Sequence, residues 1–463
     1  MTQLSEEEST RSEAALATVA DQLGRAFIRP GEEGWDAARR PWNLAVDQRP
    51  AAVAYPRTIA DVQLLLAVAA AEGFTVTVQP NGHGANGSME NCILVRTTAF
   101  DEVTIDAHSR TARIGAGVKW GSVAPLLDGT GLIALPGTNP DITVAGYLLS
   151  GGHSWFSRTY GVAAHSIVAV ELVDATGTLQ RITAESDPDL LWGLRGAGGL
   201  FGVVTALEIT LFPAPTLFGG RLLFPGAVAE VVFDQAARLM DDAPNELNII
   251  LGMMNLPDIE MVPPPLRGQT VATVDVVFVG TATAGQTLLA PLLAAVTPLV
   301  DLTREFIPSQ LGAVSDEPTA PSAAEDWSAV GATLDSESLH ALIAAFRAAT
   351  PAGLTLLQVR PLGGAQADAQ AASGGVAGHL DGGFVTFAAA IIMDPTRVID
   401  RQAVFAPFDQ AMRGRAGSGN LPSMLGNGAQ LADAYSPAAL ARLAEIKRRV
   451  DPNNLFRSNR ALP

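Results

Sequence analysis

The chain has 463 residues, of which 48% are hydrophobic and 17% charged, and it carries a formal net charge of −17. This length and composition are typical of a globular protein with two or three domains and exclude a disordered chain. The negative charge argues against nucleic acid or an anionic membrane surface as a partner. A single cysteine excludes an intrachain disulfide and a cysteine-rich metal site.

The first eight residues are acidic and lack an apolar stretch, so they do not have the pattern of a signal peptide. No run of eighteen apolar residues predicts a membrane-spanning helix. We therefore expect a cytoplasmic protein without a membrane partner. No cluster of His, Asp or Glu has the spacing of metal ligands, so we predict no metal site.

Hydrophobic periodicity predicts the secondary structure of the first part of the chain. Helices are expected at 13–23, 59–72, 120–127 and 188–194, and strands at 74–78, 92–96, 111–118, 167–173, 178–182 and 203–211. The helix after Thr58 has the clearest ends, because Thr58 and Asp61 form a capping-box pattern and Gly73 follows its last apolar residue. The strand that ends at residue 78 leads into a glycine-rich loop, and a second strand follows that loop.

The composition changes at 212–215, a Phe-Pro-Ala-Pro sequence, beyond which long glycine loops become rare. There we expect helices at 227–240, 285–295 and 339–349 and strands at 271–279 and 383–393. This order predicts an α+β region in which helices cover one face of a sheet. A loop rich in alanine and glycine is expected at 363–378. The last predicted helix starts at Ser436 and Pro437 and runs to residue 450.

The loop at 80–87 is the most informative stretch of the sequence. Gly82, Gly84 and Gly87 allow the backbone to approach a ligand closely, and His83 lies among them. Successive N–H groups in such a turn can bind a pyrophosphate. The three glycines also match G-x-G-x-x-G, but a strand follows instead of a helix, which argues against a Rossmann site. The alternative is an ordinary glycine-rich turn with a surface histidine.

A second region rich in small residues covers 135–146 and continues through 150–161. So many small residues indicate a backbone that lies close to something flat or bulky. For Gly151 and Gly152, a tightly packed helix turn is an equally good interpretation.

Taken in order, these motifs resemble the berberine-bridge-enzyme-like branch of the vanillyl-alcohol-oxidase flavoproteins. The resemblance rests on the segments 42–50, 56–62, 82–83, 151–161, 174–177, 187–205 and 451–457. It is close over 35–215, good over 425–463 and faint between them. No single motif decides it, but their order is specific.

The resemblance implies an α+β fold with a two-part FAD-binding domain of the PCMH type at 1–215 and 425–463. An inserted α+β substrate-binding domain, an antiparallel sheet covered by helices, is implied at 216–424. The implied activity is an FAD-dependent oxidoreductase, either an oxidase or a dehydrogenase. Its small-molecule substrate would be an alcohol, sugar, amine or natural-product intermediate, oxidised by hydride transfer to the flavin. Dioxygen or another electron acceptor would be its second partner.

His83 is the residue that the resemblance implies is bonded to the flavin 8α carbon. Asn139 stands where many relatives have a second linking cysteine, so we expect one covalent link, and we expect Cys92 in a predicted strand to be a core residue. The residues implied to bind FAD are Pro80, Asn81, Gly82, His83, Gly84, Asn86, Gly137, Thr138, Asn139, Ile142, Thr143, Ala145, Gly146, Gly151, Gly152, Gly202, Val203, Asn453 and Phe456. In the family, the side chain at the position of Ile142 is thought to control the access of dioxygen.

His153 is the candidate catalytic base, because it aligns with a polar position near the flavin and a histidine can take up a proton near neutral pH. A structural histidine bonded to nearby backbone is the alternative. His108, His165 and His379 lie outside any motif and are expected on the surface or in loops.

The strand expected to face the flavin, 384–390, has Thr386 as its only polar residue. The usual catalytic tyrosine candidates also look absent. These departures keep open an alternative function, a flavin-binding protein with a degraded active site that acts as a binding or scaffold module.

Overall fold

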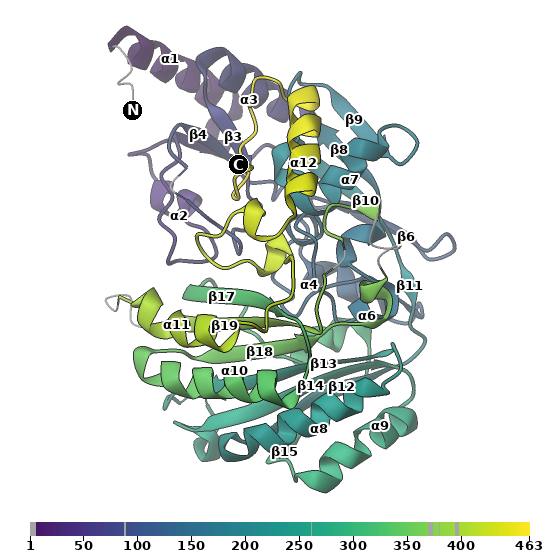
Figure 1. The fold of residues 1–463 in the computed structure, drawn as a ribbon. Coiled ribbons are helices and arrows are strands. Elements are labelled where there is room, and N and C mark those ends of the chain that lie inside the picture. Colours follow the sequence, from purple (N-terminus) through teal and green to yellow (C-terminus); the bar gives the residue numbers. More distant parts are fainter. Residues whose placement is uncertain (1–5, 88, 261, 369–373, 379, 394–397) are drawn as a thin grey trace.

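The computed structural model describes residues 6–87, 89–260, 262–368, 374–378, 380–393 and 398–463, and side chains from residue 14 onward. Figure 1 shows two regions, which we call the upper and the lower region. The upper region holds the first and last helices, α1 (Glu6–Leu23) and α12 (Pro437–Val450), and the sheets built from residues 27–210. The lower region holds a sheet built from residues 217–392, with helices beneath it. His379 and part of the loop predicted at 363–378 lie outside the described residues.

The first sheet of the upper region has the strand order β1-β2-β4-β3. Its strands are β1 (Phe27–Ile28), β2 (Ala52–Ala54), β3 (Thr75–Val78) and β4 (Cys92–Val95). Both β2 and β3 run parallel to β4, because α3 (Ile59–Glu72) carries the chain back between them. As its sequence predicts, α3 is capped by Thr58 Oγ1, which accepts the Asp61 N–H at 3.2 Å, and ends at Gly73 with φ 73°. The short α2 (Trp35–Arg39) precedes β2.

The second sheet of the upper region is antiparallel, in the order β5-β6-β10-β8-β9. Its strands are β5 (Val103–Asp106), β6 (Thr111–Gly115), β8 (Ile167–Val173), β9 (Leu179–Thr183) and β10 (Val203–Thr210). The segment between β6 and β8 forms the short elements α4 (Trp120–Val123), β7 (Leu132–Ile133), α5 (Val144–Leu148) and α6 (Ser157–Tyr160). The helix predicted at 120–127 changes to a 3-10 turn at Ala124, because Pro125 has no N–H to continue an α-helix.

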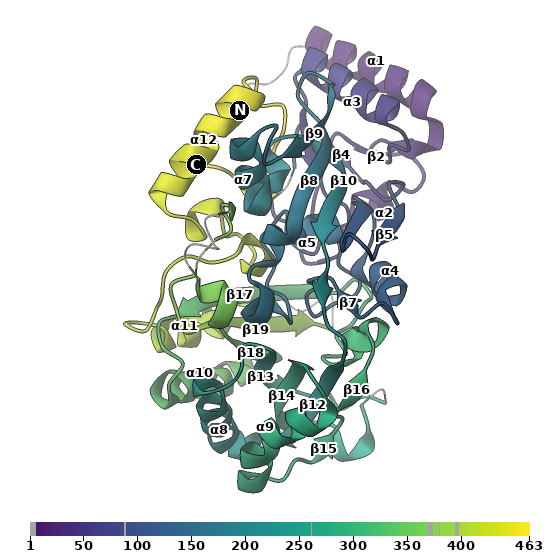
Figure 2. The same ribbon diagram turned by 90° about the vertical axis from the view of Figure 1, so that its right-hand side faces the viewer.

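The carboxyl-terminal helix returns to the upper region, where it lies beside α7 (Pro188–Ala197) in both Figure 1 and Figure 2. Ser436 caps α12 by accepting the Ala439 N–H, as the sequence predicts. Arg449 of α12 binds Asp187, the cap residue of α7, at 2.7 Å. Two segments far apart in the sequence therefore form one packed unit.

The sheet of the lower region has eight strands in the order β15-β12-β14-β13-β18-β19-β17, with β16 also on β12. They are β12 (Leu217–Pro225), β13 (Leu247–Asn255), β14 (Thr270–Val279), β15 (Val300–Asp301), β16 (Arg304–Phe306), β17 (Ala323–Gly331), β18 (Leu356–Pro361) and β19 (Phe384–Ile392). One face packs against α8 (Ala229–Asp241), α9 (Ala282–Ala295), α10 (Ser336–Ala349) and α11 (Arg401–Ala411). The composition change at 212–215 falls between β10 and β12, while the domain boundaries at 215 and 424 stay a prediction.

Strand alternation decides which side chains of this sheet face the upper region. Leu357 and Val359 of β18 lie in the core under the helices, so Gln358 and Arg360 project from the opposite face. Thr386 of β19 lies on the helix side with Phe384 and Ala388, and its hydroxyl donates to Gln358 O at 3.0 Å. Thr386, the only polar residue of the strand expected to face the flavin, therefore points toward the helices and not toward the upper region.

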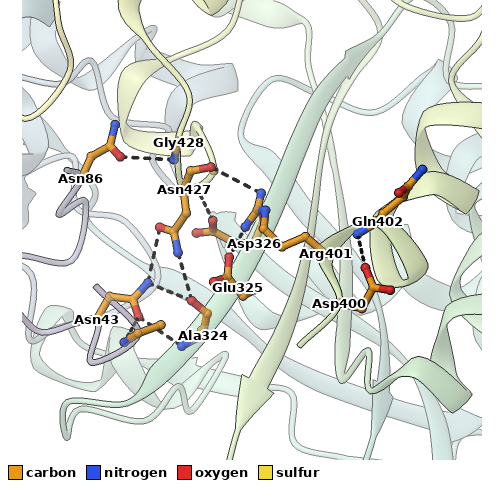
Figure 3. Close-up of polar contacts among 12 residues, drawn as sticks. Asn43, Asn86, Ala324, Glu325, Asp326, Asp400, Arg401, Gln402, Asn427 and Gly428 are labelled. Atoms are coloured by element: carbon orange, nitrogen blue, oxygen red, sulfur yellow. Dashed lines mark hydrogen bonds and ion pairs between the residues drawn. The ribbon is translucent and has the colours of Figure 1, made fainter. Parts of the chain in front are cut away.

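A hydrogen-bond network joins the two regions at β17 (Figure 3), and we call it the joint network: Asn43, Asn86, Asp326 and Asn427. The Asn43 side chain accepts the Ala324 N–H at 3.1 Å and donates to Ala324 O at 3.0 Å. Asp326 accepts the Asn427 N–H at 2.6 Å, and Asn86 accepts the Gly428 N–H at 3.3 Å. Burial raises the pKa of Asp326, and the bond from Asn427 acts against that shift.

Within the described ranges, the search for a helix both long and apolar enough to traverse a lipid bilayer found none.

Candidate functional site

A cavity lies in the upper region, where the loop after β3, the segment leading into α5, the turn between α7 and β10, and the chain end at 458–460 meet. With the open solvent at its mouth included, the cavity holds about 1160 Å³ of empty space. The chemistry of the wall, rather than this volume, therefore indicates what the cavity binds.

The structure brings nine of the predicted cofactor residues together in the wall of this cavity. They are Pro80, Asn81, His83, Gly84, Ile142, Thr143, Ala145, Gly146 and Gly202. Asn81 connects the two glycine-rich loops, because its Nδ2 donates to the backbone oxygen of Asp141 at 2.8 Å and to the Asp141 carboxylate at 3.0 Å. The two loops that the sequence indicated separately thus form one site.

Another group of predicted residues does not line the cavity and has structural contacts instead: Gly82, Asn86, Gly137, Thr138, Asn139, Gly151 and Gly152. Gly82 has φ 90°, and a Cβ there would lie 2.8 Å from Pro41 Cβ. Asn139 donates to Pro318 O at 2.9 Å and accepts the Asp141 N–H at 2.8 Å, so its side chain shapes the loop that carries Ile142. A Cβ on Gly152 would lie 2.6 Å from the ring of Tyr147.

Val203, Asn453 and Phe456 also lie away from the cavity wall. Val203 and Phe456 are buried in the core of the first sheet, and Asn453 is exposed. The motif at 451–457 instead anchors the chain end: Asp451 binds Lys447 at 2.5 Å and accepts the Phe456 N–H at 2.8 Å. This anchor directs residues 458–460 to the cavity.

His83 presents an imidazole with two unsatisfied nitrogens at the cavity wall. Its ring stacks on Trp42, with centroids 4.0 Å apart and planes at 17°. Both ring nitrogens are buried without a hydrogen-bond partner. Burial lowers the pKa of His83 to about 4, although the charge of Asp141 acts in the opposite direction. The ring is therefore neutral at pH 7, the state in which a histidine is nucleophilic.

Three further polar atoms of the cavity wall are buried without a partner: Gln79 Oε1, the Tyr147 hydroxyl and Asn459 Oδ1. Buried polar groups are normally hydrogen-bonded, so such a concentration at one cavity indicates a bound ligand with its own donors and acceptors. Small residues complete the wall, since a Cβ on Gly198 would lie 2.7 Å from Leu149. A flavin nucleotide, which is flat and rich in polar atoms, fits this arrangement.

His153 is buried, but it is not part of the cavity wall. Its Nδ1 lies 3.3 Å from Gln366 Nε2. Burial, together with the charge of Arg360, lowers the pKa of His153 to about 3, so the ring is neutral at pH 7. Its role as a base stays a prediction.

Sequence reasoning missed part of the cavity wall: Val78, Gln79, Ala116, Tyr147, Leu149, Ser150, Gly196, Ala197, Gly198, Gly199, Val204, Pro422, Ser423, Leu431, Ser458, Asn459 and Arg460. A signal existed for some of them, because 196–199 belongs to a motif that carries the family resemblance. His108 is exposed and His165 half-buried. Across the described ranges, no three His, Cys, Asp or Glu side chains are grouped as metal ligands would be.

Comparison with known protein families gives two matches. Residues 50–183 match the FAD binding domain, and residues 432–463 match the model described as berberine and berberine like. Both matches fall in the upper region, and the first includes both glycine-rich loops of the cavity.

Among curated proteins, the chain is similar to (R)-6-hydroxynicotine oxidase of Paenarthrobacter nicotinovorans, with 32% identity over 219 residues, 47% of this chain and 48% of the relative. It is also similar to xylooligosaccharide oxidase of Thermothelomyces thermophilus, with 31% identity over 186 residues, 39% of this chain and 37% of the relative. The chain thus matches half or less of the length of these relatives.

Solved structures match over nearly the whole chain. Physcomitrella patens BBE-like 1 has a TM-score of 0.84 at 20% identity, covering 97% of this chain and 99% of the other. 6-Hydroxy-D-nicotine oxidase of Arthrobacter nicotinovorans has a TM-score of 0.80 at 22% identity, covering 94% and 97%. These likenesses confirm the predicted α+β fold class. Together with the family matches they confirm the resemblance: the chain carries an FAD binding domain and a carboxyl-terminal segment that matches berberine and berberine like proteins, and its fold is that of a BBE-like protein.

Proposed function

We propose that this protein is an FAD-dependent oxidoreductase that oxidises a small organic molecule, such as an alcohol, a sugar or an amine. The observation that carries the proposal is the cavity in which both glycine-rich loops and five unpartnered polar atoms meet. The match to the FAD binding domain and the oxidase names of the relatives support it. When bound, the flavin accepts a hydride from the substrate.

We also propose that His83 holds the flavin by a single covalent bond. The neutral ring at the cavity wall has a free electron pair and no competing hydrogen bond. Cys92, the one thiol of the chain, is buried in β4 with its Sγ 3.2 Å from Thr77 Oγ1, and it does not line the cavity. Asn139 has no thiol to offer, so the chain has one candidate for attachment.

The chain's own residues must also remove a proton from the substrate. His153 is neutral at pH 7 and so has a ring nitrogen open to a proton, although its pKa of about 3 makes the ring a weak base in the unliganded protein. Tyr147 lies in the cavity wall, and burial raises the pKa of its hydroxyl above the usual range, so the hydroxyl stays protonated and is able to donate a hydrogen bond to a bound ligand. We assign the base to His153 and the orientation of substrate or flavin to Tyr147. Ile142 lies in the same wall, and we propose that its side chain restricts the access of dioxygen.

The test is anaerobic mixing of the yellow holoprotein with a panel of alcohols, sugars and amines while the flavin absorbance is recorded. Bleaching by at least one substrate, followed by turnover with an artificial electron acceptor, is expected. With that substrate, His153→Ala should slow the bleaching by about 10² to 10⁴-fold while the flavin stays bound. A flavin that dithionite reduces but no compound of the panel reduces would favour the binding or scaffold function.

A further inference from the structure

Four arginines are buried in the part of the chain that the structure describes: Arg96, Arg158, Arg360 and Arg460. Three of them donate to backbone carbonyl oxygens. Arg96 and Arg460 each reach three carbonyls, and Arg158 reaches two, although its Nε is unpartnered. These contacts hold loops in place, which is a structural role.

Arg360 differs from the other three. Its Nη2 donates to Gln358 Oε1 at 2.6 Å, and its Nε has no partner. Among the described residues it forms no ion pair within 4.0 Å. Glu317 and Asp275 act on it electrostatically from a greater distance, and Asp275 is bound to Arg221 at 2.6 Å. Burying a guanidinium group without a paired anion lowers the stability of the fold, and a bound anion would offset that loss.

Arg360 does not line the cavity, but its position relates it to Tyr147, which does. It projects from the face of β18 opposite the helices, toward the upper region. Its charge acts on Tyr147, which lines the cavity, and on His153. Tyr147, His153, Gln358, Arg360 and Gln366 form what we call the Arg360 cluster.

Three polar atoms of the Arg360 cluster are buried without a partner: the Tyr147 hydroxyl, Gln366 Oε1 and Arg360 Nε. They come from α5, from the segment after β18, and from β18 itself. Arg360 Nε and the Tyr147 hydroxyl can donate, Gln366 Oε1 accepts, and the guanidinium has no carboxylate of the described residues within ion-pair distance.

We propose that Arg360, which is oriented by its hydrogen bond to Gln358, binds a carboxylate group of the substrate and so anchors it. The guanidinium group can donate two parallel hydrogen bonds to a carboxylate. The bound carboxylate would supply the negative charge within ion-pair distance that the described residues do not supply. The inference rests on the proposed function and narrows it, because the substrate class becomes acids that carry the oxidisable alcohol, sugar or amine. An ordered water at Arg360 is the competing explanation, and it would show no preference for an anion.

The experiment is equilibrium dialysis of the holoprotein against acetate, benzoate and gluconate, each compared with its neutral amide. At least one acid should bind more tightly than its amide. Arg360→Met should weaken that acid by about 10 to 100-fold and leave the amide unchanged. Arg360→Lys, which keeps the charge but not the fork, should restore part of the binding.

Arg347→Met is the matched control, because it removes the same charge from an exposed ion pair with Glu230 on the helix-covered side. Flavin content and melting temperature confirm that each variant is folded. The anchor is rejected if none of the three acids binds better than its amide, or if Arg360→Met leaves the preference intact. Dialysis measures binding without turnover. If an acid binds more tightly than its amide but no compound reduces the flavin, the proposed function is rejected and the anchor is not. Flavin reduction by neutral substrates without an acid preference rejects the anchor alone.

Discussion

The joint network and the Arg360 cluster are both groups of polar side chains between the upper and lower regions, the first partly buried and the second buried, and their hydrogen bonding differs. The described side chains of the joint network, Asn43, Asn86, Asp326 and Asn427, have no buried polar atom without a partner. The Arg360 cluster has three such atoms. Satisfied polar groups stabilise a fold, whereas unsatisfied ones cost stability unless a ligand completes them. The difference indicates which cluster holds the regions together and which one serves the site.

Asn43→Ala should produce the largest loss of stability. It removes both bonds to Ala324 and leaves a backbone N–H without its partner. We expect the free energy of unfolding to fall by about 1–3 kcal/mol, measured by urea unfolding of the holoprotein. A variant as stable as the wild type would show that the joint network does not hold the regions together.

The stability of the protein should fall on acidification because His153 is buried in its neutral form. The unfolded histidine takes up a proton below a pH of about 6.5, whereas the folded one does so only near its pKa of about 3. As the pH drops, the unfolded state therefore takes up a proton before the folded state does. The free energy of unfolding falls between pH 6.5 and 3, and the contribution of His153 is constant above pH 6.5. The slope approaches about 1.4 kcal/mol per pH unit.

His153→Asn should flatten this dependence. Urea unfolding between pH 7 and 5 measures the effect before most carboxylates take up protons. Parallel curves for the wild type and the variant would contradict a buried neutral His153.

Arg360→Met should have the smallest effect on stability. It replaces an unpaired buried charge by an apolar chain of similar length, a change that is often neutral or stabilising. We expect the urea midpoint of the variant to equal or exceed that of the wild type. A loss comparable to that of Asn43→Ala would place Arg360 among the structural arginines and remove the contrast between the two clusters.

Local signals in the sequence predicted the elements with distinct caps. The capping box of α3 and the Ser436–Pro437 start of α12 act within four residues, so both helices could be placed from sequence. The strands β12 and β18 were missed, because β12 contains Gly219, Gly220 and Pro225, and β18 is short and ends in Pro361.

The site was predicted where a motif is contiguous and missed where distant segments meet. Pro80 to Gly84 and Ile142 to Gly146 lie in glycine-rich loops whose composition indicates a ligand. Ser423 and Asn459 reach the cavity only because β17 and α12 fix the path of the chain around them, which no local pattern records. Arg360 depends on strand register, since a shift of one residue would turn it into the helix-covered core, as Thr386 is turned.

The central claim is that the cavity holds one FAD bonded to His83, and the intact mass of the acid-denatured protein tests it most directly. The wild type should be heavier than its polypeptide by the mass of one FAD less the two hydrogens that are lost when the bond forms and the flavin is reoxidised, and Cys92→Ala should carry the same addition. His83→Ala should show the mass of the polypeptide alone. A wild-type protein without the addition, or an addition that persists in His83→Ala, would contradict the claim.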